Sequence, residues 1–87
     1  MDFRWNEWNR EHIAKHDVSP EEAEFVANRA RRPFPRKEGQ KWFVIGRGRG
    51  GRLVRVVYLL DIDGTAFVIH AMPLTEREKR RHRRKRR

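Results

Sequence analysis

The stretch from Arg52 to Met72 constrains the fold most, because it has the pattern of two adjacent β-strands joined by a turn. Segments 52–60 and 65–71 are rich in Val, Leu, Ile and aromatic residues, which favour a pleated, half-buried strand. Residues 61–64 between them read Asp-Ile-Asp-Gly, and glycine after aspartate supplies the positive φ of a tight turn. We therefore predict a β-hairpin in the middle of the only sheet.

The register of this hairpin decides how Tyr58 and His70 lie relative to each other. A two-residue loop pairs Tyr58 with Ile69 and sends His70 to the opposite face of the sheet. A three-residue loop pairs Tyr58 with Val68 and puts His70 on the same face. The sequence leaves both registers open.

Length and residue content bound the class of protein. The 87 residues allow one domain with a small core. The sequence contains no cysteine, which excludes disulfides and thiolate chemistry and fits a cytoplasmic protein. No apolar run approaches the roughly 20 residues that span a bilayer, and the N-terminus lacks the apolar segment of a signal peptide. We expect a soluble protein that does not enter a membrane.

The net charge of +10 is unevenly distributed along the chain. Residues 1–28 carry seven acidic and three basic side chains, whereas residues 29–55 carry one acidic and ten basic side chains. Residues 75–87 carry two acidic and nine basic side chains. A basic middle and tail behind an acidic first third indicates binding of a polyanion, most commonly a nucleic acid.

The first third begins with a short strand-like segment and continues into a helix. Residues 1–5 alternate between polar and apolar side chains, as a small edge strand does. Trp8, His12 and His16 then recur at a spacing of four residues. This spacing aligns them along one stripe of a helix predicted over residues 7–16.

A second helix follows a clear capping signal. Ser19 as the N-cap, Pro20 at the first helical position and a glutamate three residues after the serine form a capping box. The helix is expected to end before Pro33. Residues 15–18 therefore form the corner between the two helices.

The remaining segments complete the sheet and add a tail. Residues 31–39, with two prolines and a glycine, predict an irregular basic loop, and residues 41–46 predict a third strand. A capping box over residues 75–78, Thr-Glu-Arg-Glu, predicts a basic helix after the last strand. Beyond it, residues 79–87 offer no apolar face that could pack.

The predicted fold class is α+β, in a single domain over residues 1–78 followed by the basic tail 79–87. Two N-terminal helices pack on a three- to four-stranded antiparallel sheet, and a basic C-terminal helix follows it.

Several chemistries have no support in the sequence. The histidines at positions 12, 16, 70 and 82 match no zinc-protease or cysteine-supported spacing, so neither a metal nor another cofactor is predicted. No Gly-x-Ser-x-Gly motif is present, and Ser19 is engaged as a cap. The Gly/Arg-rich residues 47–51 lack the spacing of a nucleotide-binding loop, which excludes an NTP site.

The residues that remain fit cleavage of RNA without a metal. Lysine and arginine can neutralise the phosphate, a tyrosine or histidine can move protons, and the 2′-hydroxyl of the RNA is the nucleophile. Tyr58 and His70 are candidates for the proton transfer, and Lys15 with His16 could approach from the helical corner. The alternative for Tyr58 and His70 is a packed side chain in the sheet.

A series of motifs extends over nearly the whole predicted domain. It comprises F-x-W, Lys-His with Val two residues later, a Ser-x-Glu-Glu-Ala-type helix start, a strand ending in Gly-Arg, G-R-L-V-x-V-V-Y, and T-x-R-E. In this chain the motifs are Phe3/Trp5, Lys15 to Val18, Ser19 to Ala23, Ile45 to Arg47, Gly51 to Tyr58 and Thr75 to Glu78. Their order and spacing resemble the BrnT family of type II toxins.

The resemblance implies a compact RelE-like α+β fold and endoribonuclease activity that arrests translation. It also implies an antitoxin partner encoded beside the toxin, and a toxin–antitoxin complex that binds DNA at its own promoter. The candidate catalytic residues that it implies by position are Lys15, His16, Arg52, Tyr58 and Glu78. His70 and Arg55 are added from the local sequence.

Two departures from the family pattern affect the site. Asp17 stands where the family commonly has glycine after Lys-His. The last strand reads Ile-His-Ala-Met over residues 69–72, where the family usually has Ile-Ser-Ala-Arg. Met72 removes a phosphate-binding charge. His70 in place of serine either supplies a proton-transfer group or leaves a weakened site, and the sequence leaves both open.

The resulting prediction is a metal-independent endoribonuclease toxin. Arg52 and Lys15 are predicted to bind phosphate, and Tyr58 or His70 to transfer protons. The basic side chains predicted to bind RNA without sequence preference are Arg31, Arg32, Arg36, Lys37, Arg47, Arg49 and Arg55.

Two other functions fit the same sequence. A non-catalytic RNA- or DNA-binding module could stack bases on Phe34, Trp42 and Phe43 without any acid or base. A protein-interaction domain could use its basic tail to pair with an acidic partner.

Overall fold

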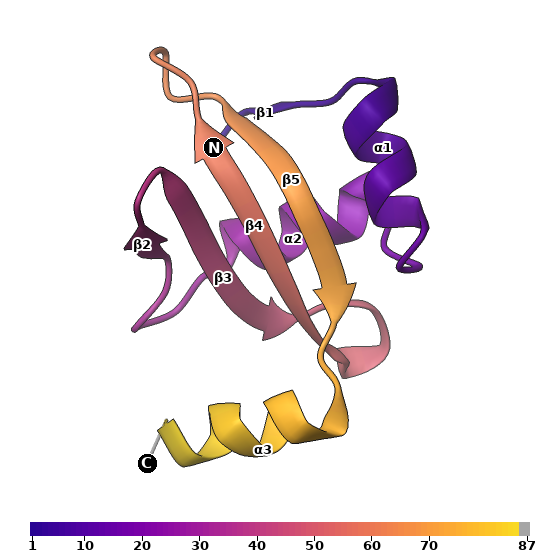
Figure 1. Ribbon diagram of the computed structural model, residues 1–87, viewed down its shortest axis with the longest axis vertical. Helices are drawn as coiled ribbons and strands as arrows, with labels where there is room; N and C mark the ends of the chain where they lie inside the picture. Colours follow the sequence, from indigo (N-terminus) through magenta and orange to yellow (C-terminus); the bar gives the residue numbers. More distant parts are fainter. Residues whose placement is uncertain (86–87) are drawn as a thin grey trace.

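A mixed sheet organises the fold. The computed structural model describes residues 1–85, and its strands lie in the order β1-β5-β4-β3-β2 (Figure 1). They are β1 (Phe3–Arg4), β2 (Arg36–Glu38), β3 (Lys41–Arg47), β4 (Leu53–Leu60) and β5 (Ala66–Pro73). The predicted hairpin is β4 and β5, with β4 at the centre of the sheet and β3 antiparallel to it. The α+β class is therefore confirmed.

Two short strands make the sheet larger than the three- to four-stranded antiparallel sheet that we predicted. β1 pairs with β5 in parallel, so the sheet is mixed. β2 pairs with β3 inside the segment 31–39, for which the prediction of an irregular loop was wrong at Arg36–Glu38. The prolines at positions 33 and 35 each remove only their own N–H group. The three residues after them can therefore still pair, and Gly39 (φ 62°) then turns the chain into β3.

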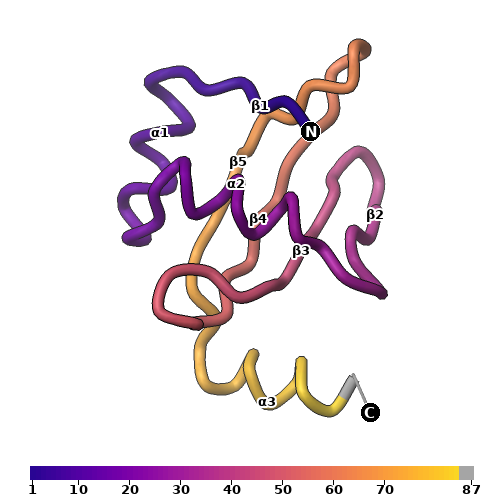
Figure 2. Tube along the Cα trace, turned by 180° about the vertical axis from the view of Figure 1, so that it is seen from behind, coloured from indigo at the N-terminus to yellow at the C-terminus, as the bar shows by residue number. Residues whose placement is uncertain are grey.

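Three helices surround the sheet, namely α1 (Glu7–Ala14), α2 (Pro20–Asn28) and α3 (Glu76–Lys85). From behind, α2 crosses β3 and β4, whereas α1 lies beside β5 (Figure 2). The side chain of Ser19 accepts a hydrogen bond from the amide of Glu22 at 3.1 Å, which confirms the predicted start of α2. No helix among residues 1–85 is long and apolar enough to cross a membrane.

The core lies between the helices and one face of the sheet. Along β4, Val54, Val56 and Tyr58 alternate toward this face, as expected for a strand with a two-residue repeat. Each buried side chain of valine size or larger contributes about 1.5 to 3 kcal/mol. The residues of this core that are at most 2% exposed are Ile13, Val18, Ala23, Val26, Val44, Val54, Val56, Tyr58, Ala66, Val68 and Ala71.

The β4–β5 hairpin changes register halfway along. Tyr58 lies opposite Val68, but the next residue, Val57, lies opposite His70. Ile69 is therefore an extra residue in β5, which is a β-bulge. The pairing of Tyr58 with Val68 agrees with one of the two registers that we considered. The bulge nevertheless puts His70 on the face of the sheet opposite Tyr58. In an uninterrupted register, the pairing of Tyr58 with Val68 would have put His70 on the same face as Tyr58.

The corner between α1 and α2 depends on Asp17. The amide of Val18 donates to the carbonyl of Ile13 at 3.2 Å, and the amide of Asp17 donates to the carbonyl of Ala14 at 3.0 Å. These two bonds form a Schellman motif, in which the residue at the place of Asp17 adopts a left-handed conformation. The φ of Asp17 is 61°. Glycine adopts such a conformation without strain, and Asp17 adopts it here with a side chain in place.

The C-terminal helix begins at the predicted capping box and is longer than predicted. The amide of Glu78 donates to the Thr75 hydroxyl at 3.2 Å, and the amide of Thr75 donates to the Glu78 carboxylate at 2.9 Å. α3 continues to Lys85, so the predicted domain boundary after residue 78 falls inside a helix. The part of the predicted tail at residues 86–87 lies outside the described residues.

α3 packs through His82, a residue of the predicted tail. His82 is 8% exposed, and its ring lies 6.0 Å from the ring of Phe34. The expectation that nothing beyond residue 79 could pack was therefore wrong. The sequence did contain a signal, because His82 is the one residue of 79–87 that is neither lysine nor arginine.

Candidate active site and nucleic-acid interface

Three histidines meet where α1 runs beside β5. The centroids of the His16 and His70 rings are 5.3 Å apart, those of His12 and His70 are 6.0 Å apart, and those of His12 and His16 are 6.2 Å apart. All three side chains are half-buried, so solvent and a ligand can reach them. We refer to these three residues as the histidine cluster.

Two local features bring the histidine cluster together. The Schellman corner turns the chain directly after His16, and the helical repeat places His12 on the same stripe. On β5, Ala71 belongs to the core, and alternation along the strand puts His70 on the other face. His16 and His70 were predicted as site residues for separate reasons, whereas the participation of His12 was missed.

Aromatic packing holds His12, the third residue of the histidine cluster, in place. The rings of Trp8 and His12 stack with centroids 5.1 Å apart and an angle of 7° between their planes. Trp8 also stacks with Phe67 at 6.1 Å. The four-residue spacing of tryptophan and histidine along a helix was the signal that could have identified His12.

The surroundings of His70 favour the neutral form of its ring. Burial lowers the pKa of His70 below its ordinary value of 6.5, and the positive charges of Arg55, His16 and His12 lower it further. The carboxylate of Glu78 acts in the opposite direction. A neutral imidazole in a half-buried site can accept a proton, which is the property of a general base.

Arg55 lies close to His70 in the sheet. It pairs with Met72, two residues beyond His70 on β5. Its guanidinium donates to Glu78 at 2.8 Å. A hydrogen bond from the Thr75 amide and the charge of Arg55 hold the pKa of Glu78 below 4.5. Both oxygens of Glu78 are thus engaged, so this predicted catalytic residue orients Arg55 and caps α3.

Lys15 stands next to the histidine cluster. It is the C-cap residue of α1, and its side chain is exposed. Among residues 1–85, no group of three or more His, Cys, Asp or Glu side chains is arranged to hold a metal ion. The histidine cluster, with Lys15 and Arg55 beside it, can offer an acid, a base and positive charge.

Tyr58 does not belong to the histidine cluster. Its side chain is 1% exposed inside the core, and burial raises the pKa of its hydroxyl above 10. A phenol that is buried there cannot reach a substrate. The prediction of Tyr58 as a proton-transfer group is corrected to a packing role.

Arg52 is engaged inside the protein. Its guanidinium donates to the two Glu22 oxygens at 2.6 and 3.0 Å and to the Asp17 carbonyl at 2.6 Å. The Glu22 side chain is only 4% exposed, and the hydrogen bond from Arg52 lowers its pKa. The predicted phosphate contact is therefore replaced by a structural contact that holds the start of β4 to α2.

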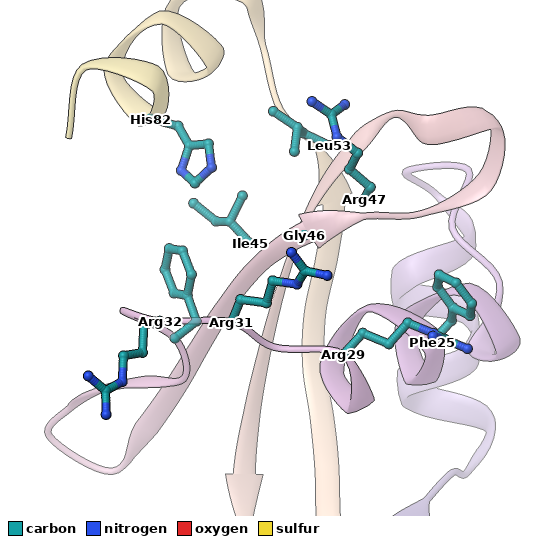
Figure 3. Close-up of a pocket in the computed structure, with 10 residues that line it drawn as sticks. Phe25, Arg29, Arg31, Arg32, Ile45, Gly46, Arg47, Leu53 and His82 are labelled. Atoms are coloured by element: carbon teal, nitrogen blue, oxygen red, sulfur yellow. The ribbon is translucent and has the colours of Figure 1, made fainter. Parts of the chain in front are cut away.

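A second feature is a cleft of about 340 Å³ between the end of α2, the segment 29–35, the ends of β3 and β4, and α3 (Figure 3). We refer to it as the arginine cleft. It is lined by Phe25, Arg29, Arg31, Arg32, Phe34, Ile45, Gly46, Arg47, Leu53 and His82. No carboxylate lines it within the described part of the chain, so its charge is strongly positive.

The structure gathers part of the predicted RNA-binding set in this cleft. Arg31, Arg32 and Arg47 line it together with Arg29, which was missed although it ends α2 beside them. An adjoining cavity of about 240 Å³ includes Arg36 and Arg55.

The other two predicted RNA-binding residues, Lys37 and Arg49, line neither the arginine cleft nor the adjoining cavity. The ammonium of Lys37 lies 5.4 Å from the ring centre of Trp42. Arg49 has an exposed side chain, and its backbone amide donates to Glu22 at 2.7 Å. Both residues add to the positive surface without lining the cleft.

Comparisons of this chain with protein-family models, with curated proteins and with solved structures found no match. The geometry of the histidine cluster and the arginine cleft, together with the motif series along the sequence, therefore carries the functional argument.

Proposed function

We propose that this chain is a metal-independent endoribonuclease that acts in the cytoplasm as the toxin of a type II toxin–antitoxin system. The observation that carries the proposal is the histidine cluster, in which the His70 and His16 ring centroids lie 5.3 Å apart. The lowered pKa of His70 favours its neutral form. A pair of imidazoles beside an arginine supplies the acid, the base and the positive charge that RNA cleavage requires.

In the proposed reaction, His70 accepts the proton of a ribose 2′-hydroxyl. The 2′-oxygen attacks the adjacent phosphorus, and the bond from phosphorus to the 5′-oxygen breaks. Protonated His16 donates its proton to the leaving 5′-oxygen. Arg55 neutralises the charge that develops on the phosphoryl oxygens. The products are a 2′,3′-cyclic phosphate and a 5′-hydroxyl, so all atoms and protons balance.

The charge distribution supports a polyanionic substrate and an acidic partner. Basic side chains follow the acidic first third of the chain and give a net charge of +10. The same surface would attract an antitoxin of opposite charge. Contact with DNA would then come indirectly, through the toxin–antitoxin complex. The RelE-like arrangement remains part of this proposal, because it comes from the motif resemblance.

The test has two arms, growth on induced expression and cleavage of RNA by purified protein in a metal chelator. We expect growth arrest and RNA fragments that end in a 2′,3′-cyclic phosphate. His16→Gln and His70→Gln should each reduce the cleavage rate by about 10²-fold to 10⁴-fold. Glu11→Gln, an exposed change on α1, is the control and should cleave as the wild type. Full activity of the doubly substituted histidine variant would overturn the proposal.

A non-catalytic RNA-binding module is the second candidate. The arginine cleft favours it, since arginine and aromatic side chains bind RNA without an acid or base. This alternative predicts salt-sensitive RNA binding with no cleavage product. Healthy growth and intact RNA on induction, with binding retained, would decide in its favour.

A further inference from the structure

Within the described residues, no carboxylate neutralises the positive charge of the arginine cleft. Within residues 1–85, the ion pairs involve Arg4, Arg52, Arg55 and Lys79, and none of the four arginines of the cleft. Arg47 donates to the carbonyl of Gly51 at 2.8 Å. Four guanidinium groups around one cleft without a carboxylate repel one another, and a bound anion relieves that repulsion.

The arginines are spread along the cleft. In Figure 3, Arg31 extends toward Gly46, Arg29 lies beside Phe25, and Arg32 points to the other side. A single phosphate would need these groups to converge on one point. Charges in a row instead match successive phosphates of a polynucleotide.

The cleft continues beneath α3. A second cavity of about 450 Å³ shares Arg47, Leu53 and His82 with it and adds Lys79 and Arg83 from the helix. The two cavities together form a basic groove that runs from α2 to α3. A groove of this kind tracks a nucleic-acid backbone.

The aromatic side chains in the groove favour unpaired nucleotides. Phe25 is 46% exposed, and the Cζ atom of Arg29 lies 4.3 Å from the centre of its ring. An exposed ring and an arginine plane both offer a stacking surface to a base. A base can reach such a surface only where it is not paired and stacked within a duplex.

We propose that this groove is a binding site for single-stranded RNA that flanks the scissile nucleotide, with phosphates along Arg31, Arg32 and Arg47 and a base against Phe25. The choice of RNA as the ligand rests on the proposed function, whereas the site itself rests on the groove. α3 completes the site by packing His82 on Phe34. Loss of the groove should weaken substrate binding and leave the chemical step unchanged.

The experiment measures binding of a fluorescent 12-nucleotide 2′-O-methyl RNA, which lacks the nucleophilic hydroxyl and cannot be cleaved. Arg31→Ala with Arg32→Ala should raise the Kd about tenfold and reduce the slope of log K against log salt by about 1.4, the value for two phosphate contacts on a single strand. The control is Arg10→Ala with Arg77→Ala, which removes the same charge from exposed positions outside the groove. Its Kd should change less than threefold. If the two double variants changed the Kd and the salt slope equally, the proposed binding site would be overturned.

Further measurements separate the groove from the catalytic proposal. Phe25→Ala should weaken binding of the single strand and leave the weaker binding of a duplex of the same sequence unchanged; equal affinity for both RNAs would overturn the preference for unpaired RNA. His70→Gln should bind the probe as the wild type does. If the wild type binds the probe but does not cleave unmodified RNA, the proposed ribonuclease activity is rejected and the proposed binding groove stands. Cleavage whose KM is unchanged by the Arg31/Arg32 substitutions would reject the groove and keep the ribonuclease.

Discussion

Arg52 donates hydrogen bonds to both carboxylate oxygens of Glu22, at 2.6 and 3.0 Å, across 30 positions of the sequence. Glu22 Oε2 also accepts the amide of Arg49 at 2.7 Å. Gly48 lies so close to the same carboxylate that a Cβ atom there would clash with it. This one buried carboxylate therefore holds the connection between β3 and β4 against α2.

Removal of Arg52 should destabilise the protein, because it leaves the Glu22 charge buried without its partner. We expect Arg52→Ala to lower the free energy of unfolding by about 2 kcal/mol, less than for a fully buried pair since Arg52 is 28% exposed. Urea unfolding followed by circular dichroism measures this. Arg49→Ala is the control, because it keeps the backbone bond to Glu22. Equal stability of the two variants would contradict the structural role of Arg52.

His70 should titrate below the ordinary histidine range. We expect NMR titration of its ring protons to give a pKa under 6.5, since burial and nearby positive charge disfavour the protonated form. Arg55→Gln should raise that pKa, because the variant removes a positive charge and leaves Glu78 in place. A pKa of His70 that does not change in this variant would show that Arg55 does not act on it.

The same shift makes stability depend on pH. The unfolded chain binds a proton at His70 more readily than the folded chain does, so the unfolded state gains protons first as the pH falls. Stability should therefore decrease as the pH drops below about 6.5, toward the lower pKa of the folded state. The His70→Gln variant should lack this part of the dependence of stability on pH. Chemical denaturation at pH 7.5 and 5.5 compares the two proteins.

Tyr58 should matter for packing and leave cleavage unaffected. We expect Tyr58→Phe to cleave RNA at the wild-type rate, since the hydroxyl lies in the core away from the histidine cluster. Tyr58→Ala should cost about 3 to 5 kcal/mol of stability, through the cavity that it leaves. Single-turnover cleavage and thermal unfolding measure the two effects. Loss of cleavage in a well-folded Tyr58→Phe protein would show that the Tyr58 hydroxyl takes part in the reaction.

The left-handed residue at the helical corner should prefer glycine. We expect Asp17→Gly to be more stable than Asp17→Ala by about 1 kcal/mol, because only alanine pays the cost of a Cβ atom at φ 61°. Both variants lose the 3.5 Å contact from Asp17 to Arg52, so that contact cancels in the comparison. Denaturant midpoints measured side by side test this, and equal midpoints would contradict it.

Local sequence signals predicted most of the elements correctly. The Ser19 N-cap, the Thr75 capping box and the β4–β5 hairpin depend on residues that are close in sequence. The reciprocal half of the predicted capping box at Ser19 does not form, because the Glu22 carboxylate binds Arg52 and the Arg49 amide instead. β2 was missed because its pairing depends on β3 and not on its own composition. The packing of α3 was missed because His82 contacts Phe34, which lies 48 positions earlier in the chain.

In the candidate site, too, local sequence identified residue types but not the contacts that depend on distant parts of the chain. Arg52 and Tyr58 were chosen by residue type and position in a motif, and the structure places one in a buried ion pair and the other in the core. His16 and His70 were chosen as well, but their meeting depends on the Asp17 turn and the Ile69 bulge. Neither feature has a sequence pattern strong enough to reveal a contact between α1 and β5.

The bulge also determines where β5 can change length. Removing Ile69 would leave His70 opposite Val57 and would keep Ala71 in the core, because Ile69 is the residue without a partner in the ladder. Removing His70 or Ala71 would instead take away a residue of the histidine cluster or of the core. A β5 that lost Ile69 could therefore keep both its core residues and its histidine cluster.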